Sequence, residues 1–327
     1  MPKRVLTAPL TAEGQRVDRF VADMLPERSR TAWQREIDAG HVLIYGRPIK
    51  ARDLVHAGDE VEVSWTEPEP RALWSAGELD RSLIVYEDAW ILVVNKPRGL
   101  VVHPSRGHQD DSVVHRVAPL LGGPDTDFRP GVVHRLDQNT TGLLVLARDE
   151  NTRARLSKAI AERLVHRRYI AVVTGQMTPA LGMIDAPIGR HPQNRLKMAV
   201  ILGGRSAVTH YRSIAQCPGY TLIQLSLETG RTHQIRVHLA AVGHPVVGDP
   251  DYGGQMVPGL GGQALHAAQL AFLHPHTGQP LCFTAYPPDD WARLNFDGWQ
   301  SLTPWVFEPI DGCSPILTAA LLDRIFP

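Results

Sequence analysis

The sequence predicts an α+β protein in two parts, a small N-terminal α/β domain followed by a larger, strand-rich domain with helices at its flanks. Two observations support this. Residues 15–66 combine apolar positions at helical spacing with short strand-like runs. From Leu83 onward, short apolar runs alternate with Gly, Pro, Asn and Asp, a pattern typical of strands joined by turns. The 327 residues are enough for one large and one small domain.

The N-terminal part is expected to contain two helices and two short strands. Val17, Phe20 and Val21 lie at helical spacing, and Pro26 ends that helix. Ser29 is a suitable N-cap for the second helix. That helix includes Trp33 and Ile37 and stops at Gly40, and the strands are Val42–Tyr45 and Glu60–Trp65.

Proline content sets the expected domain boundaries. Pro68 and Pro70 make a helical spacer improbable, so residues 67–78 are expected to form a linker. The domains are therefore predicted at residues 1–66 and 79–295, with a C-terminal tail of unassigned role at 296–327.

The larger domain is expected to begin with a hairpin, Leu83–Tyr86 and Trp90–Asn95. A helix is predicted over Glu150–Leu164, capped by Asp149. The expected strands after it are the second half of 166–173, then 184–189, 206–215 and 220–228, with an exposed loop at 194–199 and a closing strand that begins near Gln263–Ala267.

Composition limits the possible partners. Lys plus Arg (34) equals Asp plus Glu (34), so a nucleic-acid binder would have to rely on local patches. Residues 28–52 offer one, with six basic side chains against two acidic ones, although a merely solvated face fits equally well. The candidate contacts in this patch are Arg28, Arg30, Arg35, Arg47 and Lys50.

The cysteine pattern and the hydropathy indicate a cytoplasmic protein. Cys217, Cys282 and Cys313 are far apart and odd in number, which fits neither a disulfide framework nor a metal-binding pair. No apolar stretch resembles a signal peptide or approaches 18 residues, so no membrane span is expected.

Residues 134–147 place polar side chains directly before a buried strand. Asn139 and Gly142 carry turn chemistry, and the apolar run Leu143–Ala147 predicts the strand. Arg135 and Asp137 would thus be held at the end of a rigid element, where catalytic groups are usually placed. The alternative is that Asp137 only caps the turn.

Residues 230–239, Gly-Arg-Thr-His-Gln-Ile-Arg-Val-His-Leu, fit two patterns. Their apolar residues match both a strand and a helix, and Gly243 favours a helix that stops there. His233 and His238 suggest a zinc site. They would face opposite sides of a strand or lie about 140° apart on a helix, so no metal site is predicted.

These motifs together resemble the pseudouridine synthase family that modifies large-subunit ribosomal RNA and some tRNA. The resemblance rests on His134-Arg135-Leu136-Asp137 with Thr141-Gly142-Leu143, on Lys96-Pro97 followed by His103-Pro104, on Tyr169 after basic residues, on Gly230–Leu239, and on Gly248–Gly254 with Gln263–Ala267. Residues 15–66 are similar to the RNA-binding module named after a small-subunit ribosomal protein, although Ile44-Tyr45-Gly46 stands where that module usually has Val-Asn-Gly.

The resemblance implies a mixed, largely antiparallel sheet flanked by helices and the isomerisation of uridine to pseudouridine without metal or organic cofactor. It assigns catalysis to Asp137, with Tyr169 against the base and Arg231 as the cation beside the carboxylate. Arg135 would fill the space that the extruded base leaves. His134, His233, Gln234 and Lys96 are weaker candidates for substrate contacts, and Lys96 alternatively only decorates a strand end.

The expected partner is RNA, ribosomal RNA rather than tRNA, and the enzyme is expected to be a monomer. Two rivals remain. A non-catalytic RNA-binding protein would not need the trio Asp137, Tyr169 and Arg231. A metal-dependent hydrolase, suggested by the 15 histidines, lacks a pair at ligand spacing.

Overall fold

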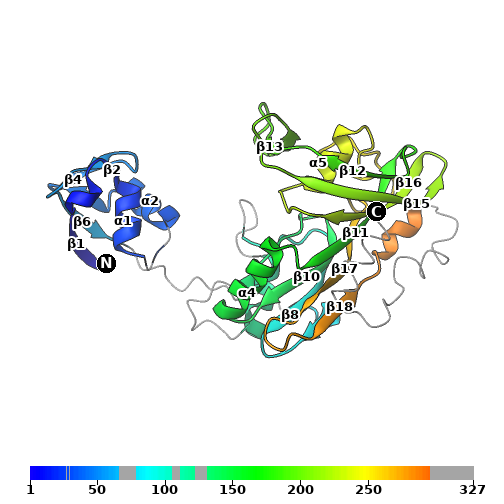
Figure 1. The fold of residues 1–327 in the computed structure, drawn as a ribbon, viewed down its shortest axis with the longest axis horizontal. Helices are drawn as coiled ribbons and strands as arrows, with labels where there is room; N and C mark the ends of the chain where they lie inside the picture. Colours follow the sequence, from blue (N-terminus) through cyan, green and yellow to red (C-terminus); the bar gives the residue numbers. More distant parts are fainter. Residues whose placement is uncertain (27, 29, 66–78, 105–110, 122–130, 295–327) are drawn as a thin grey trace. The chain divides into compact units, whose positions relative to one another are not determined.

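The computed structural model describes residues 1–26, 28, 30–65, 79–104, 111–121 and 131–294. The chain divides into two compact units, Met1–Arg71 and Ala72–Pro327, drawn in Figure 1. The predicted cap Ser29, the linker 67–78 and the tail 296–327 lie outside the described residues. In the described part of the chain, no helix is long and apolar enough to cross a membrane.

The first unit packs two helices against a four-stranded antiparallel sheet of order β1-β6-β3-β4. The helices are α1 (Val17–Met24) and α2 (Arg30–Asp38), and the sheet strands are β1 (Lys3–Thr7), β3 (Val42–Ile44), β4 (Arg47–Pro48) and β6 (Glu60–Ser64). A short 3-10 helix η1 (Leu10–Ala12) and a pair of two-residue strands, β2 (Gln15–Arg16) and β5 (Leu54–Val55), complete it.

The core of the first unit confirms the helix prediction. Trp33 is fully buried, its indole N–H donates to the Leu25 carbonyl, and its ring meets Trp65 edge-on. Strand β1 was not predicted, because only Leu6 of that strand is buried and its residues therefore show no alternating pattern.

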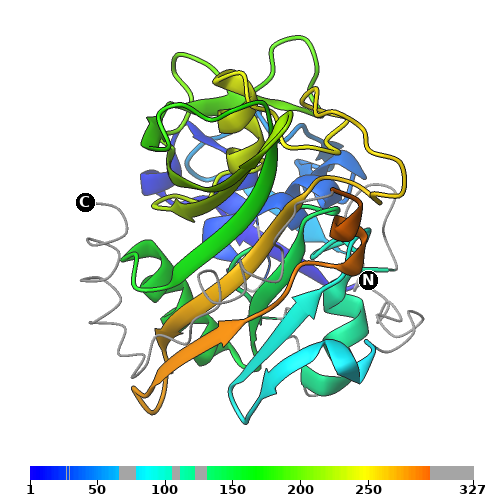
Figure 2. The same cartoon turned by 90° about the vertical axis from the view of Figure 1, so that its right-hand side faces the viewer.

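The second unit is built on a ten-stranded sheet, as counted over the described residues. Its main path runs β12-β15-β16-β11-β17-β10-β8-β7, while β18 pairs with β17 and β9 with β10. Figure 2 shows cyan β7 and β8 towards one end of this unit and yellow-green β15 and β16 towards the other. The strands are β7 (Ile84–Glu87), β8 (Ile91–Lys96), β9 (Gly131–Val132), β10 (Thr141–Ala147), β11 (His166–Thr174), β12 (Leu181–Asp185), β15 (Val208–Cys217), β16 (Tyr220–Leu227), β17 (Leu265–Leu273) and β18 (Pro280–Thr284).

Helices and a small hairpin surround this sheet. The hairpin consists of β13 (Ile188–Arg190) and β14 (Met198–Val200). The helices are α3 (Val113–Val117), α4 (Glu150–Ala161), α5 (Gln234–Ala241) and the 3-10 segments η2 (Arg81–Leu83), η3 (Ala118–Leu121) and η4 (Asp289–Leu294).

The sheet is mixed, as predicted, because β10 and β17 pair in parallel while the other described pairs are antiparallel. Their register joins Thr141 to His266 and Gly142 to Ala267. Gly142 has φ +108°, and a Cβ there would lie 2.3 Å from the Ala267 carbonyl oxygen. Only glycine therefore permits this contact at the centre of the sheet. Gly142 belongs to the strand, whereas the turn is closed earlier, by Thr140 N–H donating to Asp137 O.

Both faces of β10 are buried, which explains its continuous apolar run. Leu144 and Leu146 join one core with Ile235 and Leu239 of α5. Leu143 and Val145 face the other core, which contains Leu156 of α4. The strand thus fixes the residues just before it between two packed layers.

Several boundaries differ from the prediction. Helix α4 ends at Ala161, three residues early, and Arg163 then adopts a positive φ. The expected loop 194–199 is a loop only to Lys197, because Met198–Val200 pairs with β13. The segment 230–239 is a helix from Gln234 onward, as favoured.

Candidate active site

A cavity of about 580 Å³ lies where the turn before β10 meets the start of β11 and the N-terminus of α5. Its volume is within the range typical of small-ligand sites. Seven of the eight predicted catalytic and substrate-binding residues line it, namely His134, Arg135, Asp137, Tyr169, Arg231, His233 and Gln234. Residues up to 100 positions apart therefore meet at one end of the central strands.

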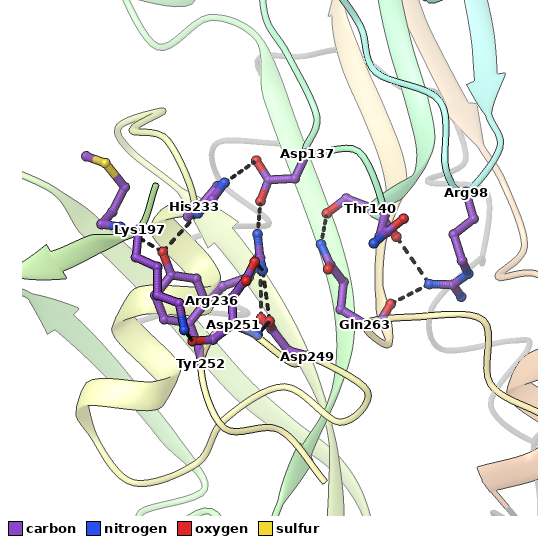
Figure 3. A network of polar contacts seen from close by, with 12 residues as sticks. Arg98, Asp137, Thr140, Lys197, His233, Arg236, Asp249, Asp251, Tyr252 and Gln263 are labelled. Carbon is purple, nitrogen blue, oxygen red and sulfur yellow. Dashed lines mark hydrogen bonds and ion pairs between the residues drawn. The ribbon is translucent and has the colours of Figure 1, made fainter. Parts of the chain in front are cut away.

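The turn that carries Asp137 is held by hydrogen bonds from three sides. Lys96 Nζ donates to the carbonyl of Gln138, Arg98 Nη1 to that of Asn139 (3.1 Å), and Gln263 Nε2 to the Thr140 hydroxyl (2.9 Å). The last two contacts appear on the right of Figure 3. Such bonds fix the backbone of a loop that has no regular ladder of its own. Asp137 is thus presented on a rigid support.

Lys96 was predicted as a substrate contact, and the structure corrects this. Its side chain is 1% exposed, and Nζ donates to three carbonyls, those of Pro97, Leu100 and Gln138, at 2.8–2.9 Å. All three ammonium donors are thereby used inside the protein. Burial lowers the pKa of Lys96 to about 7, although the nearby charge of Asp137 opposes that shift. Lys96 braces the turn and does not reach a phosphate.

The cation beside Asp137 is Arg236, not the predicted Arg231. Arg236 Nη1 donates to Asp137 Oδ2 at 3.2 Å. The Arg231 guanidinium also lines the cavity, but its Nε donates to the carbonyl of Ser206 at 3.0 Å. The carboxylate of Asp137 is 14% exposed and therefore open to a substrate. The alternative that Asp137 only caps its turn does not account for this charge-assisted bond.

Two acidic side chains, the buried Asp249 and the exposed Asp251, orient Arg236 (Figure 3). Its Nε and Nη2 form a fork with Asp249 at 2.7 and 2.8 Å, and Nη2 also reaches Asp251 at 2.7 Å. Its guanidinium lies 4.9 Å from the Tyr252 ring centre. Burial opposes the charge, but the hydrogen bonds that Arg236 donates to Asp249 and the charge of Asp137 outweigh burial and raise the pKa of Arg236. A fixed cation thus stabilises the negative charge of Asp137.

Tyr169 and His134 form an apolar wall of the cavity. Tyr169 is 5% exposed, and burial raises the pKa of its phenol, which therefore stays protonated at neutral pH. Burial and the nearby charge of Arg167 lower the pKa of His134 to about 3. His134 Nε2 accepts from Val145 N–H of β10 at 3.2 Å. His134 is therefore a neutral ring that ties the cavity to the strand.

His233 faces Asp137 from the N-terminus of α5. Its Nε2 lies 4.0 Å from Asp137 Oδ1, and its Nδ1 lies 2.8 Å from the Tyr252 hydroxyl oxygen. Burial lowers the pKa of His233, so the neutral ring prevails at pH 7. Because Met198 N–H donates to the Tyr252 hydroxyl, that hydroxyl proton is available to His233 Nδ1. The Nε2–H tautomer then points towards Asp137.

Gln234 was also predicted to contact substrate, and its hydrogen bonds argue for another role. Its amide oxygen accepts from Thr229 Oγ1 and Arg231 N–H, while Nε2 donates to Val208 O and Thr209 Oγ1. The amide is saturated by the protein. Gln234 shapes the loop that leads into α5.

The zinc hypothesis for His233 and His238 does not fit the contacts. His238 Nδ1 lies 2.9 Å from Thr209 Oγ1 and Nε2 lies 2.9 Å from the Ala186 carbonyl, so both nitrogens are engaged. Within the described ranges, no group of three or more His, Cys, Asp or Glu side chains is placed to hold a metal ion.

In the first unit, two of the five predicted RNA contacts pair with acidic neighbours. Arg28 pairs with Glu36 at 3.1 Å, and Arg30 pairs at 2.9 Å with Asp18, whose side chain is fully buried. The pKa of Asp18 is lowered to about 2, because hydrogen bonds from Arg16, Gln34 and Arg30 outweigh burial. The side chains of Arg35, Arg47 and Lys50 are exposed.

The second unit has the fold and the site of an enzyme that works with a fixed carboxylate, Asp137, beside an aromatic side chain, Tyr169. The first unit is a separate small domain of the same chain. Comparison with known proteins identifies both units. Residues 90–241 match the RNA pseudouridylate synthase family, and residues 15–61 match the S4 domain.

Full-length relatives agree with these matches. An uncharacterised RNA pseudouridine synthase of Bacillus subtilis, YlyB, is 42% identical over 88% of this chain and 96% of its own length. The ribosomal large subunit pseudouridine synthase D of Pseudomonas aeruginosa is 41% identical over 90% of this chain and 95% of its own. A solved human structure, RNA pseudouridylate synthase domain containing 4, has a TM-score of 0.53 at 25% identity and covers 66% of this chain and 95% of its own.

The chain therefore belongs to the RNA pseudouridylate synthase family. It is an isomerase that converts uridine in RNA to pseudouridine, and RNA is its partner.

Proposed function

We propose that this enzyme isomerises uridines of large-subunit ribosomal RNA, with Asp137 as the catalytic carboxylate. The observation that carries the proposal is the charge-assisted bond between Asp137 and the buried Arg236, set in a cavity walled by Tyr169. The substrate class is supported by the relative from Pseudomonas aeruginosa, whose name states large-subunit modification. Such a substrate agrees with the cytoplasmic location expected from the sequence.

The reaction breaks the bond between C1′ and N1 of the uracil, turns the base, and joins C5 to C1′. The hydrogen on C5 leaves as a proton and N1 takes up a proton, so the product is an isomer of the substrate. Asp137 acts at the sugar, either as nucleophile on C1′ or as base towards the ribose. Both roles require a charged carboxylate in a site that bound RNA dries. Arg236 supplies the opposite charge without needing to reorganise, because Asp249 already holds it.

Tyr169 is assigned to stack on the uracil while it turns. Its buried ring supplies an apolar face, and its protonated phenol supplies a hydrogen-bonding group at the same wall. The neutral His233 is assigned to donate through Nε2–H to Asp137 or to the ribose beside it.

A uridine stacked in RNA hides its glycosidic bond, so the base has to be extruded, at a cost of a few kcal/mol. Arg135 is exposed at the edge of the cavity, two residues before Asp137. A flat guanidinium there can stack in the space that the base leaves. The first unit is assigned to hold the RNA, with Arg35, Arg47 and Lys50 as phosphate contacts.

Pseudouridine mapping of total RNA from cells with and without this protein tests the substrate. Loss of discrete sites in large-subunit ribosomal RNA is the expected result. Loss of sites in tRNA alone would overturn the substrate and keep the chemistry. No lost site, together with no activity of the purified protein on RNA, would favour a protein that only binds RNA.

A further inference from the structure

Arg167 shares the cavity wall with Tyr169, and neither the mechanism nor the sequence motifs assign it a task. Both residues belong to β11, two positions apart, so their side chains leave the same face of the strand. Both line the cavity, whereas Arg168 between them does not. Arg167 is therefore aimed at the place where the extruded nucleotide has to sit.

The guanidinium of Arg167 has no partner among the residues that the structure describes. Its Nε is buried without a hydrogen bond. Three other arginines of the cavity are engaged, since Arg236 binds three carboxylates, Arg163 pairs with Glu228 and Arg231 donates to the Ser206 carbonyl. The adjacent His134 is neutral and provides no counter-charge. A charged donor left unsatisfied at a cavity wall is costly to the protein unless a ligand completes it.

Gly230 has no side chain that would occupy the space beside the Arg167 guanidinium. A Cβ at residue 230 would lie 3.2 Å from Arg167 Nη1, closer than side chains normally pack, and 3.8 Å from Nη2, an ordinary contact distance. The absence of a side chain at Gly230 lets the guanidinium rest against the backbone that leads to Arg231. The group is thus placed by packing, while its hydrogen-bonding edge remains unused.

We propose that Arg167 binds one of the two phosphates that flank the target uridine. This inference rests on the proposed function and adds a substrate-binding residue to it. An uncompensated cation calls for an anion, and phosphate is the only anion that RNA offers. The two Nη groups at the end of the planar guanidinium can donate to two phosphate oxygens. Held there, the phosphate fixes the sugar of the extruded nucleotide between Tyr169 and Asp137.

The test measures RNA affinity against salt concentration, with full-length protein and a large-subunit rRNA transcript that the wild type modifies. Removing one phosphate contact lowers the slope of log Kd against log salt by about 0.7–0.9. We expect this change for Arg167→Gln, with Kd raised about tenfold at low salt. Arg167→Lys keeps the charge and should keep most of the slope. Arg153→Gln is the control, because Arg153 lies on α4 outside the cavity and pairs with Glu150.

Several outcomes would overturn the assignment. An affinity loss with an unchanged slope would mean a contact to a neutral base atom. Equal losses for Arg167→Gln and Arg153→Gln would mean a general charge effect. If Arg167→Gln does not fold, wild-type enzyme is tested on RNA with one uncharged methylphosphonate on either side of the target uridine. One of the two positions should raise Kd about tenfold, and no effect at either would refute the proposal. Lack of wild-type turnover would instead refute the proposed function.

Discussion

Replacing Arg236 by Gln should cost far more turnover than replacing Arg231 by Gln, the opposite of the order expected from the sequence. Arg236 Nη1 lies 3.2 Å from Asp137 Oδ2. At an effective dielectric constant of about 20, two charges at that distance attract by about 5 kcal/mol. Part of this is offset by desolvation, and losing one preorganised donor typically lowers kcat by about 10²–10³-fold. Arg231 bonds a backbone carbonyl instead, so we expect a loss below about tenfold.

The same substitution also removes the partner of a buried acid. Asp249 is fully buried, and leaving it unpaired costs about 3–5 kcal/mol of stability. Turnover therefore has to be compared at a temperature below the thermal unfolding transition of each variant. The chemistry offers a direct assay, because the hydrogen on C5 of uracil is released when the new bond forms. Tritium release from RNA labelled at C5, under single-turnover conditions, reports that step. A larger loss in Arg231→Gln than in Arg236→Gln would refute the assignment of the cation.

Three further predictions concern stability and RNA binding. Lys96→Met removes the ammonium donor from three carbonyls, of which those of Pro97 and Leu100 lose it without replacement while that of Gln138 still accepts from Gly99 N–H. We expect it to lower the free energy of unfolding by about 3–5 kcal/mol in denaturant titrations, whereas Lys158→Met on the surface of α4 should change it by less than about 0.5. The pKa of His134 is about 3 when folded and near 6.5 when unfolded, so the unfolded chain binds more protons between these values and stability falls as pH decreases. Between pH 7 and 5.5, the free energy of unfolding should fall by about 1.2 kcal/mol less in His134→Gln than in the wild type. Parallel curves of unfolding free energy against pH for the two proteins would contradict this. Arg47→Gln in the first unit should weaken RNA binding and reduce its salt slope by about 0.7–0.9 without changing single-turnover rates at saturating enzyme; an unchanged slope would count against that contact.

Much of the fold was predictable because its strands and helices carry regular patterns. The continuous apolar run of β10, the hairpin β7–β8 and the capped helix α4 all appear in the structure. Strand β1 was missed because it buries only one side chain. Strand β14 was missed because three residues are too few to show an alternating pattern, so its sequence resembles that of a loop. Pairing between β10 and β17 joins residues about 125 positions apart, which no local pattern contains.

The site was predictable in its residues but not in their partners. The motifs contain most of the cavity lining, but spacing alone does not show which arginine of residues 230–239 turns inward. Helix α5 begins only at Gln234, so Arg231 lies in the preceding turn while Arg236 lies on the buried side of the helix. A signal was available, since Asp249 follows closely in the chain and a buried acid requires a buried cation. The burial of Lys96, by contrast, depends on three carbonyls that only the fold brings together.

The central claim is that Asp137, held by Arg236, carries the isomerisation. The most direct test is tritium release from C5-labelled large-subunit rRNA by the purified wild type and by Asp137→Asn, with folding and RNA affinity measured alongside. We expect the wild type to release one tritium per modified uridine, and Asp137→Asn to fold, bind RNA and release none. Normal release by Asp137→Asn would contradict it.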